Sequence, residues 1–211
     1  MTSPARRGRP RSEDAGARIL GAARGLLTER GYDRFAIDEV AARAGVAKTT
    51  LYRRWPTKDH LLVALVARVQ DEVDVADTGD IRHDLTVYLS AVAAGLERMR
   101  RVGRDGAPEA GRSAGVVAEL VAAAARHPDV GEAVRALFAR RNALPLRLLE
   151  RARARGALDR AVSPGVLFDQ LAGALYYRLL ITGAPIGAGY VEGLVGQVLA
   201  GAAPAPRLER T

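Results

Sequence analysis

Hydrophobic positions in this chain recur mostly every three or four residues, and no segment alternates cleanly between hydrophobic and polar positions. Glycines and prolines separate the periodic segments from one another. The pattern therefore predicts an all-α protein. The expected helices span residues 13–30, 37–44, 47–55, 57 to about 74, 80–102, 112–126, 129–155, 164–182 and 188–200.

Several residues mark where these helices should begin, end or bend. Ser12 and Thr57 can cap the first and fourth helices with their hydroxyl groups. Gly45 can adopt the left-handed conformation that a tight turn between two helices requires. Pro56 ends the third helix, and Pro145 predicts a kink or a break within the helix at 129–155.

The composition excludes several classes of protein. Its 211 residues are 48% hydrophobic, enough for one or two domains with a core. No cysteine is present, which excludes disulfides, thiolate metal sites and catalytic thiols. The longest uncharged runs, residues 179–191 and 193–206, are too short to span a membrane. We therefore expect a soluble, cytoplasmic protein with no cofactor. We also expect no metal site, because the three histidines are scattered singly along the chain.

Positive charge is concentrated near the N-terminus. Residues 1–60 carry 13 Lys and Arg against 7 Asp and Glu, whereas the remaining residues carry 19 against 17. This asymmetry favours binding of a polyanion. Residues 1–12 contain four arginines and no acid beside Pro4 and Pro10, which indicates a disordered basic arm. A solubilising tail without a partner is the alternative interpretation.

Two short helices joined by a glycine turn, from Ile37 to Pro56, fit the helix-turn-helix pattern, in which the second helix enters the major groove of DNA. Lys58, at the start of the next helix, is placed to bind a phosphate. An ordinary helical hairpin with solvated charges is the alternative. The small core between the two helices would contain Val40, Ala41, Ala44, Val46 and Leu51, and the outer side of the second helix would present Lys48, Thr49, Thr50, Tyr52 and Arg53.

Residues 14–74 resemble the DNA-binding domain of the TetR family of bacterial transcriptional regulators. The resemblance is closest from Gly31 to Leu62. It is carried by an aromatic residue after a glycine, an Ala-Gly-Val turn, a Leu-Tyr pair in the second helix of the motif and an aromatic-Pro-x-Lys junction. Ala36 and Ala47 depart from the family pattern, since Ser or Thr is usual at position 36 and Ser is frequent at position 47, so phosphate contacts there are not expected.

The resemblance implies a homodimer of nine or ten helices that releases a pseudo-palindromic operator when a small molecule binds. Residues 13–56 would form the three-helix DNA-binding domain, with the fourth helix, to about residue 74, as a link. Residues 75–211 would form a helical bundle for dimerisation and ligand binding. Lys48, Thr49, Thr50 and Tyr52 are the implied groove and phosphate contacts, and Lys58 is the implied phosphate contact.

Candidates for an effector pocket and a dimer interface come from the expected C-terminal helices. A pocket between helices is mostly apolar with a few polar groups, although most large residues of this kind simply pack in the core. The ligand candidates are Tyr88, Met99, Phe138, Asn142, Phe168, Gln170, Tyr176 and Tyr177. The dimer candidates are Leu171, Leu175, Leu194, Val195 and Val198, on two helices with small residues that allow a four-helix interface.

One segment, Gly111 to Gly115, matches the G-x-S-x-G pattern of serine hydrolases. Its context argues against an enzyme, because a loop rather than a buried strand precedes it and no acid and histidine follow in suitable order. We therefore expect a ligand-responsive transcriptional regulator, most simply a repressor, and not an enzyme. The alternative is a helical small-molecule-binding or interaction protein, or a small hydrolase, without sequence-specific DNA binding.

Overall fold

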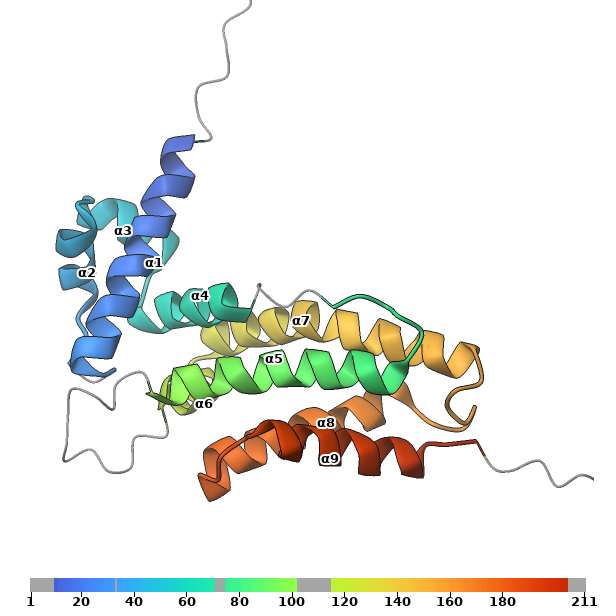
Figure 1. Cartoon of the computed structure of the whole chain (residues 1–211). Coiled ribbons are helices and arrows are strands. Elements are labelled where there is room, and N and C mark those ends of the chain that lie inside the picture. Colours follow the sequence, from blue (N-terminus) through green and yellow to red (C-terminus); the bar gives the residue numbers. More distant parts are fainter. Residues whose placement is uncertain (1–9, 33, 71–74, 102–114, 205–211) are drawn as a thin grey trace, which may run out of the picture. The chain divides into compact units, whose positions relative to one another are not determined.

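The computed structural model describes residues 10–32, 34–70, 75–101 and 115–204, with the backbone alone at 10–13, 69–70 and 101. The described residues form nine α-helices, a π-helical turn and no strand, so the predicted all-α fold is confirmed (Figure 1). In chain order these elements are α1 (Pro10–Arg30), α2 (Ile37–Ala44), α3 (Lys48–Arg54), α4 (Lys58–Gln70), α5 (Ile81–Arg101), α6 (Gly115–Arg126), α7 (Pro128–Ala154), α8 (Pro164–Tyr177), the π-helical turn η1 (Arg178–Thr182) and α9 (Ala188–Gly201).

Most helix boundaries lie close to those expected from the sequence, with three differences. The first helix begins at Pro10, so Ser12 lies within the helix and not before its first residue. Only residues 1–9 of the expected arm lie outside the described residues. The helix α7 continues through Pro145, so a break there is wrong; the proline is buried, and packing holds the helix on both sides of it. After Tyr177 the helix widens into η1 and ends at Gly183, whose φ is 65°.

The chain divides into two compact units. The first comprises residues 1–67 and 101–133, and the second comprises residues 68–100 and 134–211. The first unit therefore contains α1, α2, α3, nearly all of α4, α6 and the beginning of α7. A segment far along the sequence, residues 115–133, is thus grouped with the N-terminal helices.

Hydrophobic side chains from every helix of the first unit form its core. Because α1 and α2 pack together, Ile19 and Leu26 are buried with Val40. Exposed ion pairs, Arg43 with Glu29 and Arg30 with Glu39, join the same two helices, each with a closest distance of 2.6 Å. The other buried hydrophobic residues of this unit include Phe35, Leu51, Trp55, Leu61, Leu62, Val116, Leu120 and Ala123.

The start of α4 also lies beside the junction of α6 and α7. Thr57 caps α4 as expected, because its hydroxyl accepts a hydrogen bond from the backbone N–H of His60. His60 Nε2 lies 3.4 Å from an Asp129 carboxylate oxygen, and His127 Nε2 lies 3.8 Å from an Asp59 carboxylate oxygen. The two histidine–aspartate contacts connect helices that are about one third of the chain apart in sequence.

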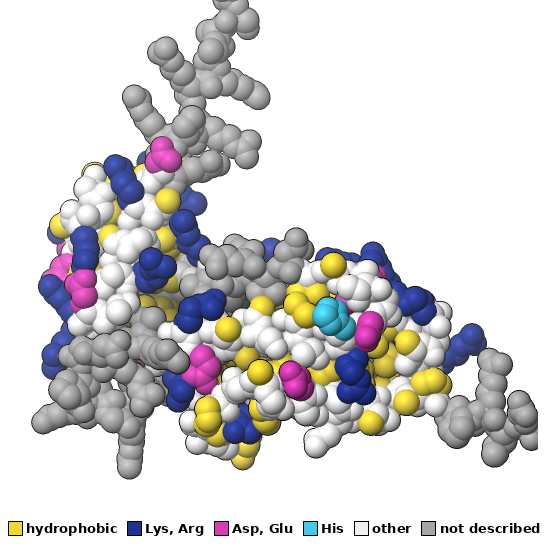
Figure 2. All heavy atoms as spheres, viewed as in Figure 1, with side chains coloured by type: hydrophobic (Ala, Val, Ile, Leu, Met, Phe, Trp, Pro, Cys, Tyr) yellow, Lys and Arg dark blue, Asp and Glu magenta, His cyan; other side chains and the backbone are white. Residues whose placement is uncertain are grey.

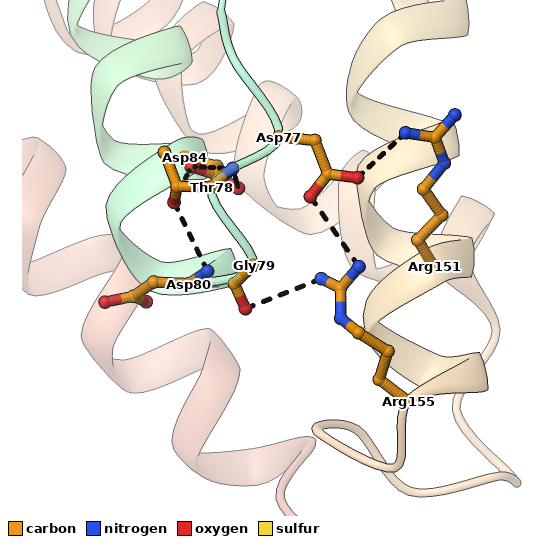
Figure 3. A network of polar contacts seen from close by, with 7 residues as sticks. All are labelled: Asp77, Thr78, Gly79, Asp80, Asp84, Arg151 and Arg155. Atoms are coloured by element: carbon orange, nitrogen blue, oxygen red, sulfur yellow. Dashed lines mark hydrogen bonds and ion pairs between the residues drawn. The ribbon is translucent and has the colours of Figure 1, made fainter.

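The second unit is a bundle of α5, most of α7, α8 and α9. A polar network ties the start of α5 to the end of α7: Asp77 lies between Arg151 and Arg155 of α7, with the closest distance, 2.8 Å, to Arg151 (Figure 3). Asp84 is buried and accepts hydrogen bonds from both the backbone N–H and the hydroxyl of Thr78. Buried polar groups are stable only with such partners. The bundle core includes Leu85, Leu89, Leu96, Leu148, Leu149, Leu167, Leu171, Leu175, Val191 and Val195.

Candidate functional sites

A tight turn sets the angle between α2 and α3. The backbone N–H of Gly45 bonds to the Ala42 carbonyl, and that of Val46 bonds to the Ala41 carbonyl, which together close the end of α2. Gly45 has a φ of 63°, in the left-handed region that favours glycine. Space is not the reason for glycine here, because a Cβ at this position would meet nothing within 4 Å. The backbone conformation alone therefore selects Gly45.

The helix α3 has one buried side and one exposed side. Leu51 is fully buried on the inner side, and Trp55 is buried just after the helix ends. Thr50 is half-buried, whereas five other side chains are exposed: Lys48, Thr49, Tyr52, Arg53 and Arg54. The exposed side of α3 thus carries donors that suit phosphates and base edges. Figure 2 shows further Lys and Arg side chains over the N-terminal helices, with a few acidic side chains among them.

Two of the exposed α3 residues share one acceptor on α2. Lys48 Nζ lies 2.7 Å from Asp38 Oδ2, and the Tyr52 hydroxyl donates to Asp38 Oδ1 at 2.9 Å. The hydrogen bond with Lys48 is the largest influence that holds the pKa of Asp38 below its ordinary value. The hydrogen bond to Asp38 likewise raises the pKa of both Lys48 and Tyr52. At neutral pH the three groups are therefore an ammonium, a neutral phenol and a carboxylate.

Asp38 is a residue that the sequence reasoning placed inside the motif without a role. An acid in the first turn of a helix is usually explained by the helix dipole. Its contact with Lys48, ten residues later, arises only when the turn at Gly45 brings α3 against α2. The available signal was the i, i+4 spacing of Lys48 and Tyr52, which places both on one face of α3.

Lys58 lies at the start of α4, beside Tyr32. Its ammonium is 4.2 Å from the centroid of the Tyr32 ring and 3.4 Å from the Tyr32 carbonyl oxygen, to which it donates a hydrogen bond. The Tyr32 hydroxyl in turn donates to Asp59. These contacts hold Lys58 at the first turn of α4, where free backbone N–H groups favour an anion.

Four aromatic candidates in the second unit come together. The Phe138 and Tyr176 ring centroids lie 5.9 Å apart in an edge-to-face arrangement, and those of Tyr88 and Phe168 lie 6.2 Å apart. Arg141 links the two pairs: it donates to the Tyr176 hydroxyl at 2.9 Å, and its carbonyl accepts from the Tyr88 hydroxyl at 3.3 Å. Sequence reasoning missed Arg141, because nothing in the sequence distinguishes it from the other arginines of α7.

The remaining C-terminal candidates lie in different surroundings. Met99 is buried and Asn142 is half-buried beside Arg141 in sequence, whereas Tyr177 and Gln170 are exposed on α8. Among the dimer candidates, the structure buries Leu171, Leu175 and Val195 completely within the protomer. Leu194 and Val198 are half-exposed on α9. The inward stripe of each helix therefore packs in the bundle, and a partner could reach only the outward stripe.

Two further features bear on the class of protein. Among the helices that the structure describes, none combines the length and the apolar character needed to cross a membrane. No group of three or more His, Cys, Asp or Glu side chains that could hold a metal ion is found in the described part of the chain. Ser113, within the G-x-S-x-G segment, lies outside the described residues.

Comparison with known proteins identifies the family. A model of the bacterial regulatory proteins of the TetR family matches residues 19–65, and a model of the tetracyclin repressor-like C-terminal domain matches residues 75–198. The chain belongs to the TetR family. It is a helix-turn-helix transcriptional regulator, and the N-terminal match at residues 19–65 contains α2 and α3.

Individual relatives agree with this assignment over nearly the whole chain. The HTH-type transcriptional regulator YdeS of Bacillus subtilis is 32% identical over 192 residues, which cover 90% of each chain. The DNA-binding transcriptional repressor TetR of Mycobacteroides abscessus is 32% identical over 194 residues, covering 90% of this chain and 94% of the relative. The crystal structure of the TetR family transcription regulator SCO0332 has a TM-score of 0.70 and 36% identity, covering 90% of this chain and 100% of that one.

Proposed function

We propose that this protein is a homodimeric transcriptional repressor that binds a pseudo-palindromic operator in the cytoplasm and releases it when a small molecule binds. One observation supports the DNA-binding part most directly. The helix-turn-helix presents Lys48, Thr49, Tyr52 and Arg53 together on the exposed side of its second helix. In a dimer, two such helices enter successive major grooves. A repressor among the relatives is consistent with this direction of regulation.

Each exposed group suits a particular DNA contact. The Lys48 ammonium can bind a guanine edge or a phosphate, and the Tyr52 hydroxyl can donate to a phosphate oxygen. Thr49 and Thr50 can donate to phosphates or contact a thymine methyl group. Lys58 would hold a backbone phosphate at the start of α4. It therefore contributes affinity without sequence preference.

The outward side of α8 and α9 supports the homodimer. These two helices pack together, and Val166, Tyr177 and Ile181 are 58, 58 and 72% exposed on α8 and the turn after it. Such apolar exposure in one stripe is typical of a protein interface. An open groove of about 570 Å³ lies on the same two helices, lined in part by Gln170 and Gln197. We infer that this stripe, together with Leu194 and Val198, meets its own copy across a two-fold axis.

The cluster around Arg141 supports an effector site in the second unit. Arg141, Phe138 and Tyr176 are half-buried, so each of these residues keeps part of its surface exposed to solvent. A guanidinium has five N–H donors, and the hydrogen bond to Tyr176 uses one of them. Within the described residues, no acidic side chain forms an ion pair with Arg141. We infer that the effector carries an anionic group, most simply a carboxylate, for Arg141, and an apolar body for the aromatic rings.

Selection of bound sequences from a random DNA library, at near-physiological salt, tests the proposed function. We expect an enriched palindrome, and fluorescence anisotropy on that site should show weaker binding by Tyr52→Ala. The milder Tyr52→Phe removes only the hydroxyl and should give an intermediate loss. Arg126→Ala, which removes an exposed charge from α6 outside the motif, serves as the control. Salt-sensitive binding with no enriched sequence would contradict the repressor and favour the alternative of a helical interaction protein.

A further inference from the structure

The contact of Asp38 with the recognition helix α3 occupies groups that are proposed to bind DNA. Both carboxylate oxygens of Asp38 are used, one by the Lys48 ammonium and the other by the Tyr52 hydroxyl. All three side chains are accessible to solvent, with Lys48 63% and Asp38 48% exposed. A DNA backbone could therefore reach the same ammonium and hydroxyl from outside.

A DNA phosphate offers these donors the same chemistry as Asp38 does. A phosphate presents anionic oxygens that accept hydrogen bonds. Lysine ammonium and tyrosine hydroxyl groups are among the donors that proteins use to contact the DNA backbone. Lys48 and Tyr52 can bind a phosphate only by giving up or sharing their bonds to Asp38. The Asp38 carboxylate is moreover a negative charge on the DNA-facing side, and it repels any phosphate that approaches without a compensating contact.

The other ion pairs of the N-terminal helices have a different geometry. Glu39 pairs with Arg30, and Glu29 pairs with Arg43, so these two ion pairs join α1 to α2. Glu39 directly follows Asp38 in sequence and is similarly exposed, at 45%. Neighbouring acids on one turn of α2 thus have different partners: Asp38 binds the recognition helix, whereas Glu39 binds α1.

We propose that Asp38 determines specificity by competing with the DNA backbone for Lys48 and Tyr52. DNA of random sequence offers only phosphates, so it gains little when it displaces the carboxylate. An operator adds base contacts, which compensate for the displacement. This inference rests on the proposed function, because it requires α3 to contact DNA. Asp38 acts here through Lys48 and Tyr52 and is a positioning residue.

The test compares Asp38→Asn with Glu39→Gln, since each removes one negative charge from the same turn of α2. Anisotropy titrations at one salt concentration measure the dissociation constant for the enriched operator and for a scrambled duplex of equal length and composition. We expect Asp38→Asn to lower the ratio of operator to scrambled affinity by about fivefold, mainly through tighter binding of scrambled DNA. Glu39→Gln should strengthen binding of both duplexes alike and leave the ratio unchanged.

A second background isolates the mechanism. The Lys48→Ala, Tyr52→Phe double variant lacks the two donors for which Asp38 and DNA compete. In this background Asp38→Asn should change the dissociation constants of both duplexes by the same factor, as Glu39→Gln does. The inference is overturned if Asp38→Asn leaves the ratio within about twofold of the wild-type value, or if its full effect persists in the double-variant background. Circular dichroism confirms folding, and Asp38→Ser provides a second variant without the carboxylate.

The same titrations separate this inference from the proposed function. If the wild-type protein binds operator and scrambled duplexes equally, the proposed function fails and the inference fails with it. If the wild-type protein discriminates between them and Asp38→Asn discriminates equally well, only the inference about Asp38 fails.

Discussion

The two helices of the helix-turn-helix begin differently from α5 and α8 of the C-terminal bundle. The residues that precede α2 and α3 are Ala36 and Ala47, and neither supplies a side-chain cap. By contrast, Asp80 accepts hydrogen bonds from two backbone N–H groups at the start of α5, and Ser163 accepts one at the start of α8. The short helices α2 and α3 are therefore held mainly by packing and ion pairs with their neighbours, whereas α5 and α8 also carry side-chain caps at their starts.

The chemical groups of the two regions differ as well. The proposed DNA contacts are exposed charged and hydroxyl groups, which can exchange protein partners for DNA. The groups around Arg141 lie deeper, and burial is the largest influence that raises the pKa of both Tyr88 and Tyr176. Both phenols therefore stay protonated and can donate hydrogen bonds. The proposed operator contacts and the proposed effector contacts are therefore separate sets of residues.

The prediction with the largest expected effect tests whether the proposed effector contacts are separate from the operator contacts. Arg141→Gln should weaken binding of an anionic effector about tenfold, because a charge-assisted hydrogen bond is lost. Thermal shift with 1-naphthoate and 1-naphthamide as probes provides the measurement. The wild-type protein should be stabilised more by the acid than by the amide, and Arg141→Gln should lose the difference.

The control for Arg141→Gln is the adjacent substitution Arg140→Gln, which removes an exposed charge from the same helix. This variant should keep the wild-type preference for the acid. Both variants should retain wild-type affinity for the operator in the absence of a probe. Equal stabilisation of the wild-type protein by acid and amide would contradict an anionic effector.

The difference in helix starts can be inverted by two substitutions. Ala47→Ser supplies a hydroxyl for the free N–H groups of α3 and should raise the free energy of unfolding by about 0.5–1 kcal/mol. Asp80→Ala removes the cap of α5 and should lower it by about 1 kcal/mol. Trp55 is the single tryptophan and is buried in the first unit, so its fluorescence during urea unfolding monitors that unit. Ala47→Ser should raise the urea concentration at the midpoint of the fluorescence transition. A lower midpoint would contradict the inference that packing holds the start of α3 in place of a side-chain cap.

The smallest expected effect concerns the Asp77 network of the bundle. The hydrogen bond from Arg151 is the largest influence that lowers the pKa of Asp77 from its ordinary value of 3.8. A lowered carboxyl pKa contributes stability above the ordinary value, and this contribution is lost as the pH falls through the lowered value. Asp77→Asn should therefore lower the melting temperature by about 2 °C near neutral pH, and the difference should close below about pH 3.

Asp169→Asn, at an exposed acid of α8 in the same unit, is the matched control for this pH dependence. Its melting temperature should follow that of the wild-type protein throughout. A gap between wild type and Asp77→Asn that is constant with pH would show that the carboxylate charge is not what joins α5 to α7.

The DNA-binding motif was largely predictable from the sequence because its signals are local. The spacing of its hydrophobic residues predicted α2 over 37–44, and the structure has it at Ile37–Ala44. Gly45 marked the turn, and Pro56 with Thr57 marked the junction before α4. Leu51 is buried and Lys48 exposed as the period of the helix requires. Each of these features depends on residues a few positions apart.

The contacts between distant residues were decided only by tertiary structure. Hydrophobic residues surround much of α8 and α9, so periodicity alone did not show that Leu171, Leu175 and Val195 face inward. Arg141 meets a tyrosine 53 residues before it and another 35 residues after it. A sequence period identifies the apolar stripe of a helix, but the partner that covers the stripe is chosen by the packing of the whole bundle.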